Sequence, residues 1–440
     1  MAGLAVSDPV KLEYIVKSQR IIPGDTIVLL PGIYDAPDGK YIFELNGTEA
    51  LPIIIKPFTQ GTVRINGGIE ITGDKSSYIK LLDLEIAPTP IERSFLDRES
   101  VNFENALNIT GAGCTVAGCY IHDGQQNMLL YGIGTAKITE NIFNGGGFML
   151  PDGGHGTNIY THNHSGGNVE IYNNLFNACF SSHTLNHWSE TINNVIGYYS
   201  HNNVFIGKRP FFGGGSGTVD NNRFYNNHIY NGLIRLGVEN ENNKITDVQY
   251  NRVYSDDYTF YLFYQRQAIV KNNIFVSKSG GFTFENTSKY ESSNIFDENV
   301  HYYRDNLPAY YTDLQLAINL QQWQALGYDL NSTYIQGLPI TNEIFVYRYS
   351  ESGRWVGMIV IWNWELLESV SVDLSTICEV DTSYKLRQMQ DYDDTANFDY
   401  IGEAVSISML NHTVKKPIAW EEELNATTFP TFGCFVVEKK

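Results

Sequence analysis

The chain has 440 residues, with 49 Asp and Glu against 30 Lys and Arg, a formal net charge of −19. A field of that sign repels nucleic acids and anionic membranes, so an anionic ligand would need a local basic patch. Charged residues make up only 18% of the chain, whereas Gly, Tyr and Phe number 39, 29 and 23. This composition argues against long disordered tails and favours strands, turns and surfaces that stack on sugars.

The N-terminal residues 8–34 predict a short amphipathic helix followed by a strand bounded by glycine. A helix there would cap the open end of a solenoid and shield its unpaired edge from other chains. Three strand-like runs then lie within residues 23–86: PGDTIVLLPGIY, LPIIIKPFTQGTVRINGGIEITG and YIKLLDLEI. These runs resemble the first coils of right-handed parallel β-helix proteins of the pectate lyase-like superfamily, including polysaccharide lyases of the chondroitinase B and alginate lyase type. The resemblance implies a fold more than a chemistry.

An Asn followed by a short alternating apolar run recurs six times, at Asn141, Asn174, Asn203, Asn222, Asn251 and Asn273. This period is typical of β-solenoids, in which each coil is too small to bury a core alone and stacks on the next. We expect these Asn residues at turns with left-handed backbone angles, each amide bonding the Asn of the next coil. A propeller or leucine-rich repeat is disfavoured, because the spacing is irregular and neither signature is present.

The predicted fold class is therefore all-β, a right-handed parallel β-helix over residues 1–310. Residues 311–339 predict a helical connector, with apolar residues at helical spacing up to Gly327. The element WQALGYDLNS within it resembles a connector found after the solenoid in bacterial β-helix carbohydrate enzymes. Longer alternating strands over residues 340–440 predict a separate β-sandwich that packs on the last coils and blocks the C-terminal edge.

The densest chemistry lies in residues 151–188, which hold five of the ten histidines: His155, His162, His164, His183 and His187. The repeat register predicts that Asn158, Tyr160 and His162 share one face of a strand, and that His183, Leu185 and His187 share one face of the next. If those faces point outward, they form a basic strip with Lys208, Arg209 and Arg235 on an acidic molecule. Such a strip suits the carboxylate or sulfate groups of an acidic sugar polymer. Solvent-exposed solenoid residues without a function are the simpler alternative.

The run PDGGHG predicts a loop at the edge of this strip, with His155 between glycines and Asp152 at its start. The stretch GGHGTNIYTHN resembles a Gly-His-Gly-(Ile)-Tyr-Thr-Gln-Asn pattern of bacterial right-handed β-helix proteins. It departs from that pattern by the inserted Thr157-Asn158 and by His162 in place of Gln.

These residues favour a polysaccharide lyase that acts by β-elimination on a uronic-acid polymer. Such an enzyme needs a cation on the carboxylate, a base for the C5 proton and an acid for the leaving oxygen. The expected catalytic residues are His155 or His162 as base, Tyr160 as acid and Arg209 as the neutralising cation, with Asp152 beside His155. The expected substrate-binding residues are Asn163, His164, His183, His187, Lys208 and Arg235. A C5-epimerase would use the same parts without cleavage.

Two other classes remain open. A glycoside hydrolase on the same fold would need two carboxylates, for which Asp123, Asp152, Asp220, Asp256 and Asp257 are candidates. A non-catalytic glycan-binding adhesin or tail-spike-like module would present aromatic residues without a matched acid and base. One solenoid fold hosts lyases, hydrolases, epimerases and binders, so the fold alone does not choose.

The sequence predicts no certain cofactor. Calcium is the more plausible metal, because Asp123, Asp152, Glu140 and Glu170 fall on neighbouring coils, whereas the histidine pairs lack a further ligand for zinc. Five cysteines leave at least one unpaired, and Cys114 and Cys119 are expected to be buried residues of neighbouring coils rather than a bridge or a metal site. The expected partner is a polysaccharide, with no nucleic acid or membrane; the oligomeric state is left open. An extracellular or virion-associated protein is expected, although MAGLAVSDPV does not read as a signal peptide.

Overall fold

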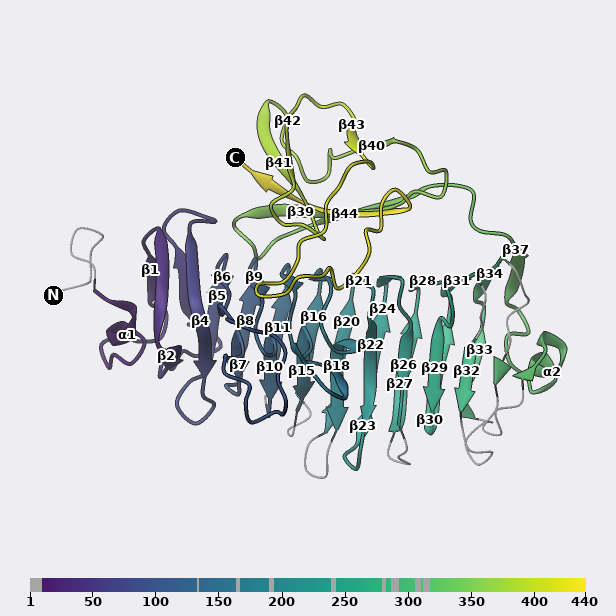
Figure 1. The fold of residues 1–440 in the computed structure, drawn as a ribbon, viewed down its shortest axis with the longest axis horizontal. Helices are drawn as coiled ribbons and strands as arrows, with labels where there is room; N and C mark the ends of the chain where they lie inside the picture. The colour runs from purple at the N-terminus through teal and green to yellow at the C-terminus, as the bar shows by residue number, and fades with distance from the viewer. Residues whose placement is uncertain are drawn as a thin grey trace.

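The computed structural model describes residues 10–132, 134–163, 167–189, 194–238, 243–278, 282–285, 293–304, 310–311 and 317–440. The chain winds into a right-handed parallel β-helix, and a small antiparallel β-domain lies along one side of it (Figure 1). The predicted fold class is confirmed. Each coil contributes strands to three parallel stacks, which we call the first, second and third stack in the order in which most coils meet them.

The first stack contains β1 (Thr26–Leu29), β3 (Ile53–Pro57), β5 (Ile79–Leu82), β8 (Cys114–Ala117), β11 (Ala136–Thr139), β16 (Val169–Tyr172), β20 (Tyr198–His201), β24 (Asn222–Tyr225), β27 (Asn243–Gln249), β30 (Gln265–Lys271) and β33 (Ile295–Asp297). Two short strands extend it: β23 (Val219–Asp220) pairs with β27, and β19 (Val195–Ile196) pairs with β23. The second stack contains β6 (Glu85–Ile86), β9 (Tyr120–His122), β12 (Ile142–Asn144), β17 (Leu175–Phe176), β21 (Val204–Ile206), β25 (His228–Tyr230), β28 (Arg252–Ser255), β31 (Ile274–Ser277), β34 (Val300–Tyr303) and β37 (Thr333–Gln336).

The third stack contains β7 (Leu107–Ile109), β10 (Met128–Tyr131), β15 (Ile159–His162), β18 (His183–Ser189), β22 (Arg209–Gly214), β26 (Ile234–Leu236), β29 (Phe260–Phe263), β32 (Phe282–Glu285) and β35 (Tyr310–Tyr311), the last pairing antiparallel with β36 (Ala317–Ile318). Near the N-terminus, the long strands β2 (Gly32–Phe43) and β4 (Val63–Ile71) serve both the second and third stacks, because β4 pairs with β6 and with β7. Alternate side chains of all three stacks point inward and form one continuous apolar core.

A ladder of buried Asn residues runs along the solenoid, as the repeats predict. Its amides bond from one coil to the next at 3.0–3.1 Å, through Asn141, Asn174, Asn203, Asn227, Asn251, Asn273 and Asn299. Asn222, the fourth residue predicted for the ladder, is not part of it, so that prediction is wrong. Asn222 lies in the first stack, where its Oδ1 accepts a hydrogen bond from the Tyr198 amide. The left-handed angle also falls one residue before each ladder Asn, as at Asn173 with φ of 56°. The ladder Asn is therefore needed for its amide rather than for its backbone angle.

We expect Asn227→Ala to lower the free energy of unfolding by about 1–3 kcal/mol for each buried group left unpaired. Asn227 Oδ1 accepts the buried Asn203 backbone amide at 3.0 Å, and its Nδ2 donates to Asn251 Oδ1 at 3.0 Å. Urea unfolding measures the loss. Asn331→Ala is the control, since Asn331 is exposed and bonds only at the surface, to Asp297; equal losses in the two variants would contradict the ladder's role.

Both ends of the solenoid carry helices. Helix α1 (Leu12–Ile15) lies where the sequence predicts an N-terminal cap, and it buries Leu12, and Val16 just after it, in the main core. Helix α2 (Leu320–Ala325) seats Trp323 in the same core at the other end. The solenoid does not end at residue 310, because β37 still pairs in parallel with β34 after α2. The expected connector is thus a cap built into the last coil; its residues 312–316 lie outside the described part.

The C-terminal domain is a β-sandwich of two unequal layers. One layer is the antiparallel sheet of β38 (Glu343–Arg348), β39 (Trp355–Trp362), β44 (Phe432–Lys439), β41 (Thr382–Gln388) and β42 (Thr395–Tyr400). The other is the ribbon of β40 (Ser369–Val372) and β43 (Val405–Ser408). Apolar residues of both layers share one core.

The sandwich packs along the second stack, from Tyr120 to Tyr302, and not across the end of the solenoid, so the expected block of the C-terminal edge is wrong. Outward aromatic and aliphatic residues of the second stack, such as Tyr120 and Leu175, form a common core with Trp355 and Trp362 of β39. Figure 1 shows the sandwich above the middle of the solenoid, with α2 at the far end. The large apolar area on the second stack is what places the domain there.

Buried carboxylates on the early coils also hold the sandwich. Glu140 accepts the backbone amides of Ser350 and Ser352, and Asp83 accepts that of Gly353. These carboxylates sit at left-handed turn residues, with φ of 58° and 57°. Glu140, considered above as a calcium ligand, is therefore used to dock the domain.

Candidate functional site

The third stack brings together most of the residues predicted for the site. Successive strands β15, β18, β22, β26 and β29 place one outward row in register: Tyr160, Asn186, Phe211, Arg235 and Tyr261. Parallel strands are about 4.8 Å apart, so this row spans roughly 19 Å along the solenoid axis. A row of that length can contact several units of an extended polymer.

His183 and Arg209 begin β18 and β22 and are direct neighbours in register. A shared hydroxyl joins them: Ser182 Oγ lies 3.2 Å from His183 Nδ1 and accepts from Arg209 Nη2 at 3.2 Å. The His183 ring packs on Phe211, with ring centroids 4.8 Å apart. His183 Nε2 and Arg209 Nε are both buried and have no hydrogen-bond partner among the described residues. Buried polar atoms are normally bonded, so these two mark a place where a ligand would complete the set.

The electrostatics of this group favour an anion. Burial, then the charges of Arg209 and Arg235, lower the pKa of His183 to about 3. Burial also lowers the pKa of Arg209, yet a guanidinium stays charged in proteins. The site at neutral pH therefore presents cationic arginines beside a neutral imidazole.

Arg235 and Tyr261 extend the group toward the later coils. The Arg235 guanidinium lies between two rings, 5.0 Å from the Phe211 centroid and 4.9 Å from that of Phe263. The two rings hold the guanidinium in place, and a guanidinium is the group best suited to bidentate contact with a carboxylate. Burial raises the pKa of Tyr261, with the Asp257 charge adding to it and the two arginines opposing it. Tyr261 thus keeps its proton and can donate it.

Tyr160 and His162 form a second, aromatic group on the same stack. The Tyr131 ring stacks on His162 at 4.1 Å and meets Tyr160 edge-on at 5.7 Å. Trp188 lies half-buried on the neighbouring strand, its ring 5.8 Å from Phe211. The half-buried rings of this group offer surfaces for sugars one strand (Trp188), two strands (Tyr160) and three strands (Tyr131) away from Arg209, whereas His162 is only 4% exposed.

His155 lies at the corner beside the third stack, on the hairpin of β13 (Phe148–Leu150) and β14 (Gly153–His155). Its Nε2 bonds Asp152 Oδ1 at 2.9 Å, and its Nδ1 lies 3.5 Å from Arg98 Nη2. The bond from His155 lowers the pKa of Asp152. The corner joins the site through the backbone, since the Ser181 amide donates to Gly156 O at 3.1 Å. The predicted loop is in fact a short hairpin.

Two expected substrate contacts are wrong. His187 is fully buried and points into the core, where it stacks on Phe212 at 3.9 Å and burial lowers its pKa to about 3. A β-bulge between His183 and Leu185 breaks the alternation, so His183 and His187 do not share a face. Asn163 is also buried, and its Oδ1 accepts the Ile196 amide at 3.0 Å.

The remaining expected residues fall into two kinds. Lys208 is half-buried at the corner just before β22, next to Arg209, as expected. His164 lies outside the described residues. Tyr131, Trp188 and Tyr261 are not among the residues predicted from sequence, although the register of the repeats places Tyr131 and Tyr261 on the same face as Tyr160.

The carboxylates considered for a hydrolase are dispersed. Asp123 is buried against Arg93 and the Ile418 amide, under the sandwich. Asp220 ends β23 of the first stack, where Lys244 Nζ lies 3.6 Å from it. Asp256 and Asp257 share the corner before β29 with Lys278 and Ser277. Over the described ranges, no three His, Cys, Asp or Glu side chains are grouped as metal ligands.

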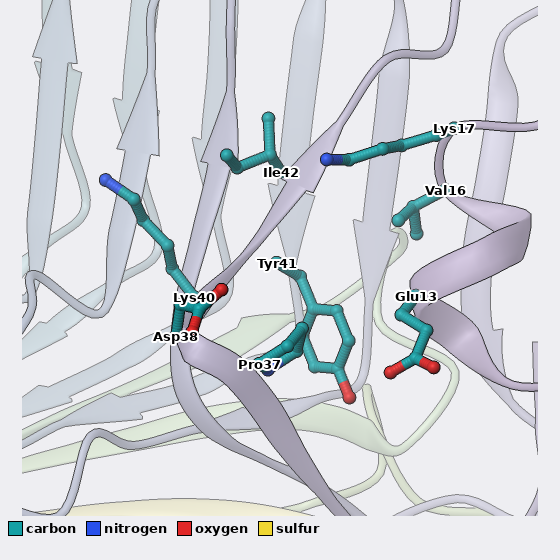
Figure 2. A pocket seen from close by; sticks show the side chains of 8 residues that line it. All are labelled: Glu13, Val16, Lys17, Pro37, Asp38, Lys40, Tyr41 and Ile42. Carbon is teal, nitrogen blue, oxygen red and sulfur yellow. The ribbon is translucent and has the colours of Figure 1, made fainter.

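A small pocket lies at the N-terminal end of the solenoid, away from these groups. Figure 2 shows it between α1 and β2, lined by Glu13, Val16, Lys17, Pro37, Asp38, Lys40, Tyr41 and Ile42. Its volume is about 150 Å³, below the roughly 300–1,000 Å³ typical of ligand sites. Lys40 Nζ is already paired with Glu70 at 2.9 Å. We regard this pocket as a packing gap under the cap.

Known proteins give only distant similarities. No family model and no curated protein matches the chain. Among solved structures, a mannuronic acid specific family 6 polysaccharide lyase from human gut microbiota has a TM-score of 0.34 at 14% identity, over 74% of this chain and 88% of the other. A family 6 polysaccharide lyase of Pseudopedobacter saltans has a TM-score of 0.37 at 16% identity, over 72% and 88%. A family 136 lacto-N-biosidase of Eubacterium ramulus has a TM-score of 0.35 at 13% identity, over 76% and 64%. Likeness at this level assigns no activity.

Two further observations bear on the expectations. The five cysteines are free, buried thiols, as expected for Cys114 and Cys119. Among the described residues, no helix has the length and apolar character that crossing a membrane requires.

Proposed function

We propose that the protein is a carbohydrate-active enzyme, a polysaccharide lyase that cleaves a uronic-acid polymer by β-elimination on the third stack. The observation that carries this proposal is the group of His183, Arg209, Arg235 and Tyr261. It combines two arginines, a neutral, half-buried imidazole with an unbonded Nε2 and a protonated phenol on one surface. These are the cation, the base and the acid that β-elimination requires.

The reaction assigns one role to each member of the group. Arg209 and Arg235 bind the uronate carboxylate and make the C5 proton more acidic. His183 Nε2 takes that proton, the C5–H electron pair forms the C4=C5 double bond, and the C4–O bond breaks. Tyr261 gives its proton to the leaving oxygen. The carboxylate also offsets the arginine charges that disfavour protonated His183, so substrate binding raises the pKa of the base toward the working pH.

This assignment moves the base and the acid from the residues expected from sequence. Arg209 keeps its expected role, whereas Tyr160 lies two strands from it, roughly 10 Å along the axis. We assign the half-buried Tyr160 and Tyr131 to neighbouring sugar units, which they contact through their rings. His162, an expected base, is only 4% exposed and supports Tyr131 from below. His155 and Asp152 line the corner. The substrate would be met outside the cell, because a polymer of this kind is extracellular.

A product assay tests the proposal. The protein is incubated with pectic, alginate, glucuronan and glycosaminoglycan polymers, and both ultraviolet absorbance and new reducing ends are measured. A lyase creates a 4,5-unsaturated end that absorbs, whereas a hydrolase creates only a reducing end. Reducing ends without absorbance would replace the lyase by a hydrolase, and no product from any polymer would favour a binding module. A chelator should leave the rate unchanged if the arginines, and not calcium, neutralise the carboxylate.

Arg209→Ala should weaken binding of the cleaved polymer at least tenfold and flatten its dependence on salt, because a charge-assisted contact is screened by ions. Calorimetric titration with an uncleaved oligomer at two salt concentrations measures both effects. Arg223→Ala is the matched control, since Arg223 is exposed on β24 of the first stack. Equal weakening in both variants would show that only the net charge matters.

A further inference from the structure

The C-terminal sandwich sends one segment back to the corner where the candidate site begins. In Figure 1 the yellow chain between β43 and β44 runs along the solenoid below the sandwich. Trp420 of this segment packs on Phe180, with ring centroids 5.0 Å apart and an interplanar angle of 77°. Phe180 lies three residues before His183. Trp420 therefore lies next to the edge of the third stack at which β18 begins with His183 and β22 begins with Arg209.

The segment is held rigidly where it meets the solenoid. The Ile418 amide donates to Asp123 at 2.9 Å, and Ile418 O accepts from Arg93 Nε at 2.9 Å. Pro417 is buried against Gly145. The contact is close, because a Cβ added to Gly145 would lie 3.3 Å from Pro417 Cβ. Ala419 then adopts a left-handed φ of 56°, which a non-glycine residue takes only when its surroundings enforce it. This bend presents the half-buried Trp420 side chain at the surface.

A cavity of about 350 Å³ opens beside Trp420. It lies between the segment and a loop of the early coils and is lined by Ile91, Glu92, Arg93, Ser94, Ala419, Trp420, Glu421 and Glu422. Its volume falls in the range of roughly 300–1,000 Å³ found for ligand sites. The side chains of Glu421 and Glu422 have no cation partner among the described residues. Arg93 is neutralised by Asp123 and contributes no free charge.

We propose that this pocket is an accessory carbohydrate site for neutral sugar units, built jointly by the solenoid and the sandwich. The indole offers an apolar surface for the C–H face of a pyranose, and the carboxylates accept hydrogen bonds from its hydroxyl groups. The same carboxylates repel a uronate. The pocket is therefore opposite in charge to the arginine group on the neighbouring coils.

If the proposed lyase function holds, the two sites together define the substrate class. A polymer with a uronate on Arg209 and Arg235 would place a neutral unit at Trp420. The preferred substrate would then be a heteropolymer of uronic acid and neutral sugar rather than a homopolymer of uronate. The pocket's preference for neutral sugars does not itself depend on cleavage.

Calorimetric titration with cellohexaose, xylohexaose, mannohexaose and maltohexaose tests the pocket directly. At least one of these should bind, and Trp420→Ala should weaken it about tenfold or more, as expected for the loss of an aromatic contact near 1.4 kcal/mol. Trp420→Phe keeps a ring and should retain most of the affinity, which separates a lost contact from a misfolded segment. Tyr14→Ala is the control, since Tyr14 is 64% exposed on the N-terminal helix α1 and does not line the pocket.

Two results would overturn the proposal that the pocket binds neutral sugars. One is that none of the four neutral hexasaccharides gives a heat of binding, and the other is that the Trp420→Ala and unchanged proteins bind with equal affinity. Arg209→Ala should leave neutral-sugar binding intact. Loss of uronate binding in Arg209→Ala with no effect of Trp420→Ala on neutral sugars would reject the pocket and keep the lyase. Neutral-sugar binding that depends on Trp420, without cleavage of any polymer, would reject the lyase and keep the pocket.

Discussion

His183→Ala should lower kcat on the cleaved polymer by about 10²- to 10⁴-fold, the usual cost of removing a general base. KM should change little, because Arg209 and Arg235 still bind the carboxylate. The reason lies in the position of the ring, whose unbonded Nε2 is buried beside Arg209. Initial rates from ultraviolet absorbance measure the effect.

His201→Ala is the matched control for this experiment. His201 is also a half-buried, ring-stacked histidine, but it lies on β20 of the first stack between Tyr172 and Tyr225. It should retain nearly full kcat. Tyr261→Phe should match the loss of His183→Ala, whereas Tyr160→Phe should act mainly on KM. If His162→Ala or Tyr160→Phe abolished turnover and His183→Ala did not, the base and acid would return to the residues expected from sequence.

Arg93→Ala should be the most destabilising single substitution proposed here, at about 3–5 kcal/mol, because it leaves a buried carboxylate without its cation. Arg93 is 1% exposed and bonds Asp123, Gly147 O and Ile418 O, so it joins the early coils, the β13–β14 corner and the sandwich segment. Urea unfolding followed by tryptophan fluorescence measures the change, and Trp420 reports on the segment directly.

Two variants separate the buried charge from a general loss of packing. Arg93→Ala combined with Asp123→Asn should recover part of the stability, since no uncompensated charge is left inside. Asn also tolerates the left-handed angle of Asp123, with φ of 61°. Arg20→Ala, at an exposed position, should change stability by less than about 0.5 kcal/mol. An Arg93→Ala protein as stable as Arg20→Ala would contradict the role of the ion pair.

Side-chain periodicity in the sequence was enough to predict the solenoid. The recurring Asn residues report a real ladder, because a buried amide must bond its neighbour on every coil. The prediction that Asn222 belongs to the ladder failed because one coil contains two Asn residues, Asn222 and Asn227. The spacing alone does not say which of the two belongs to the ladder. Alternation also predicted that Tyr160 and Arg235 share a face, since parallel strands repeat with a period of two.

Where alternation broke, the predicted site was wrong. The bulge after His183 turns His187 into the core, and no residue type in SSHTLNHW announces an extra residue in the strand. Asp123 and Glu140 were both predicted as candidate calcium ligands, and Asp123 also as a candidate catalytic carboxylate. In the structure both carboxylates instead accept backbone amides of the C-terminal domain and hold it on the solenoid. That use depends on partners about 210 to 295 residues away in the chain.

The sequence by itself determined the coil period, the inward and outward faces of most strands, the capping helix and the presence of a second β-domain, because each follows from local alternation and turn chemistry. Only the tertiary structure decided that the sandwich lies on the second stack, that His183 meets Arg209, and that Trp420 closes the corner beside them. These contacts join segments far apart in the chain, and their partners are chosen by burial of apolar surface and pairing of buried charge, which no local pattern encodes.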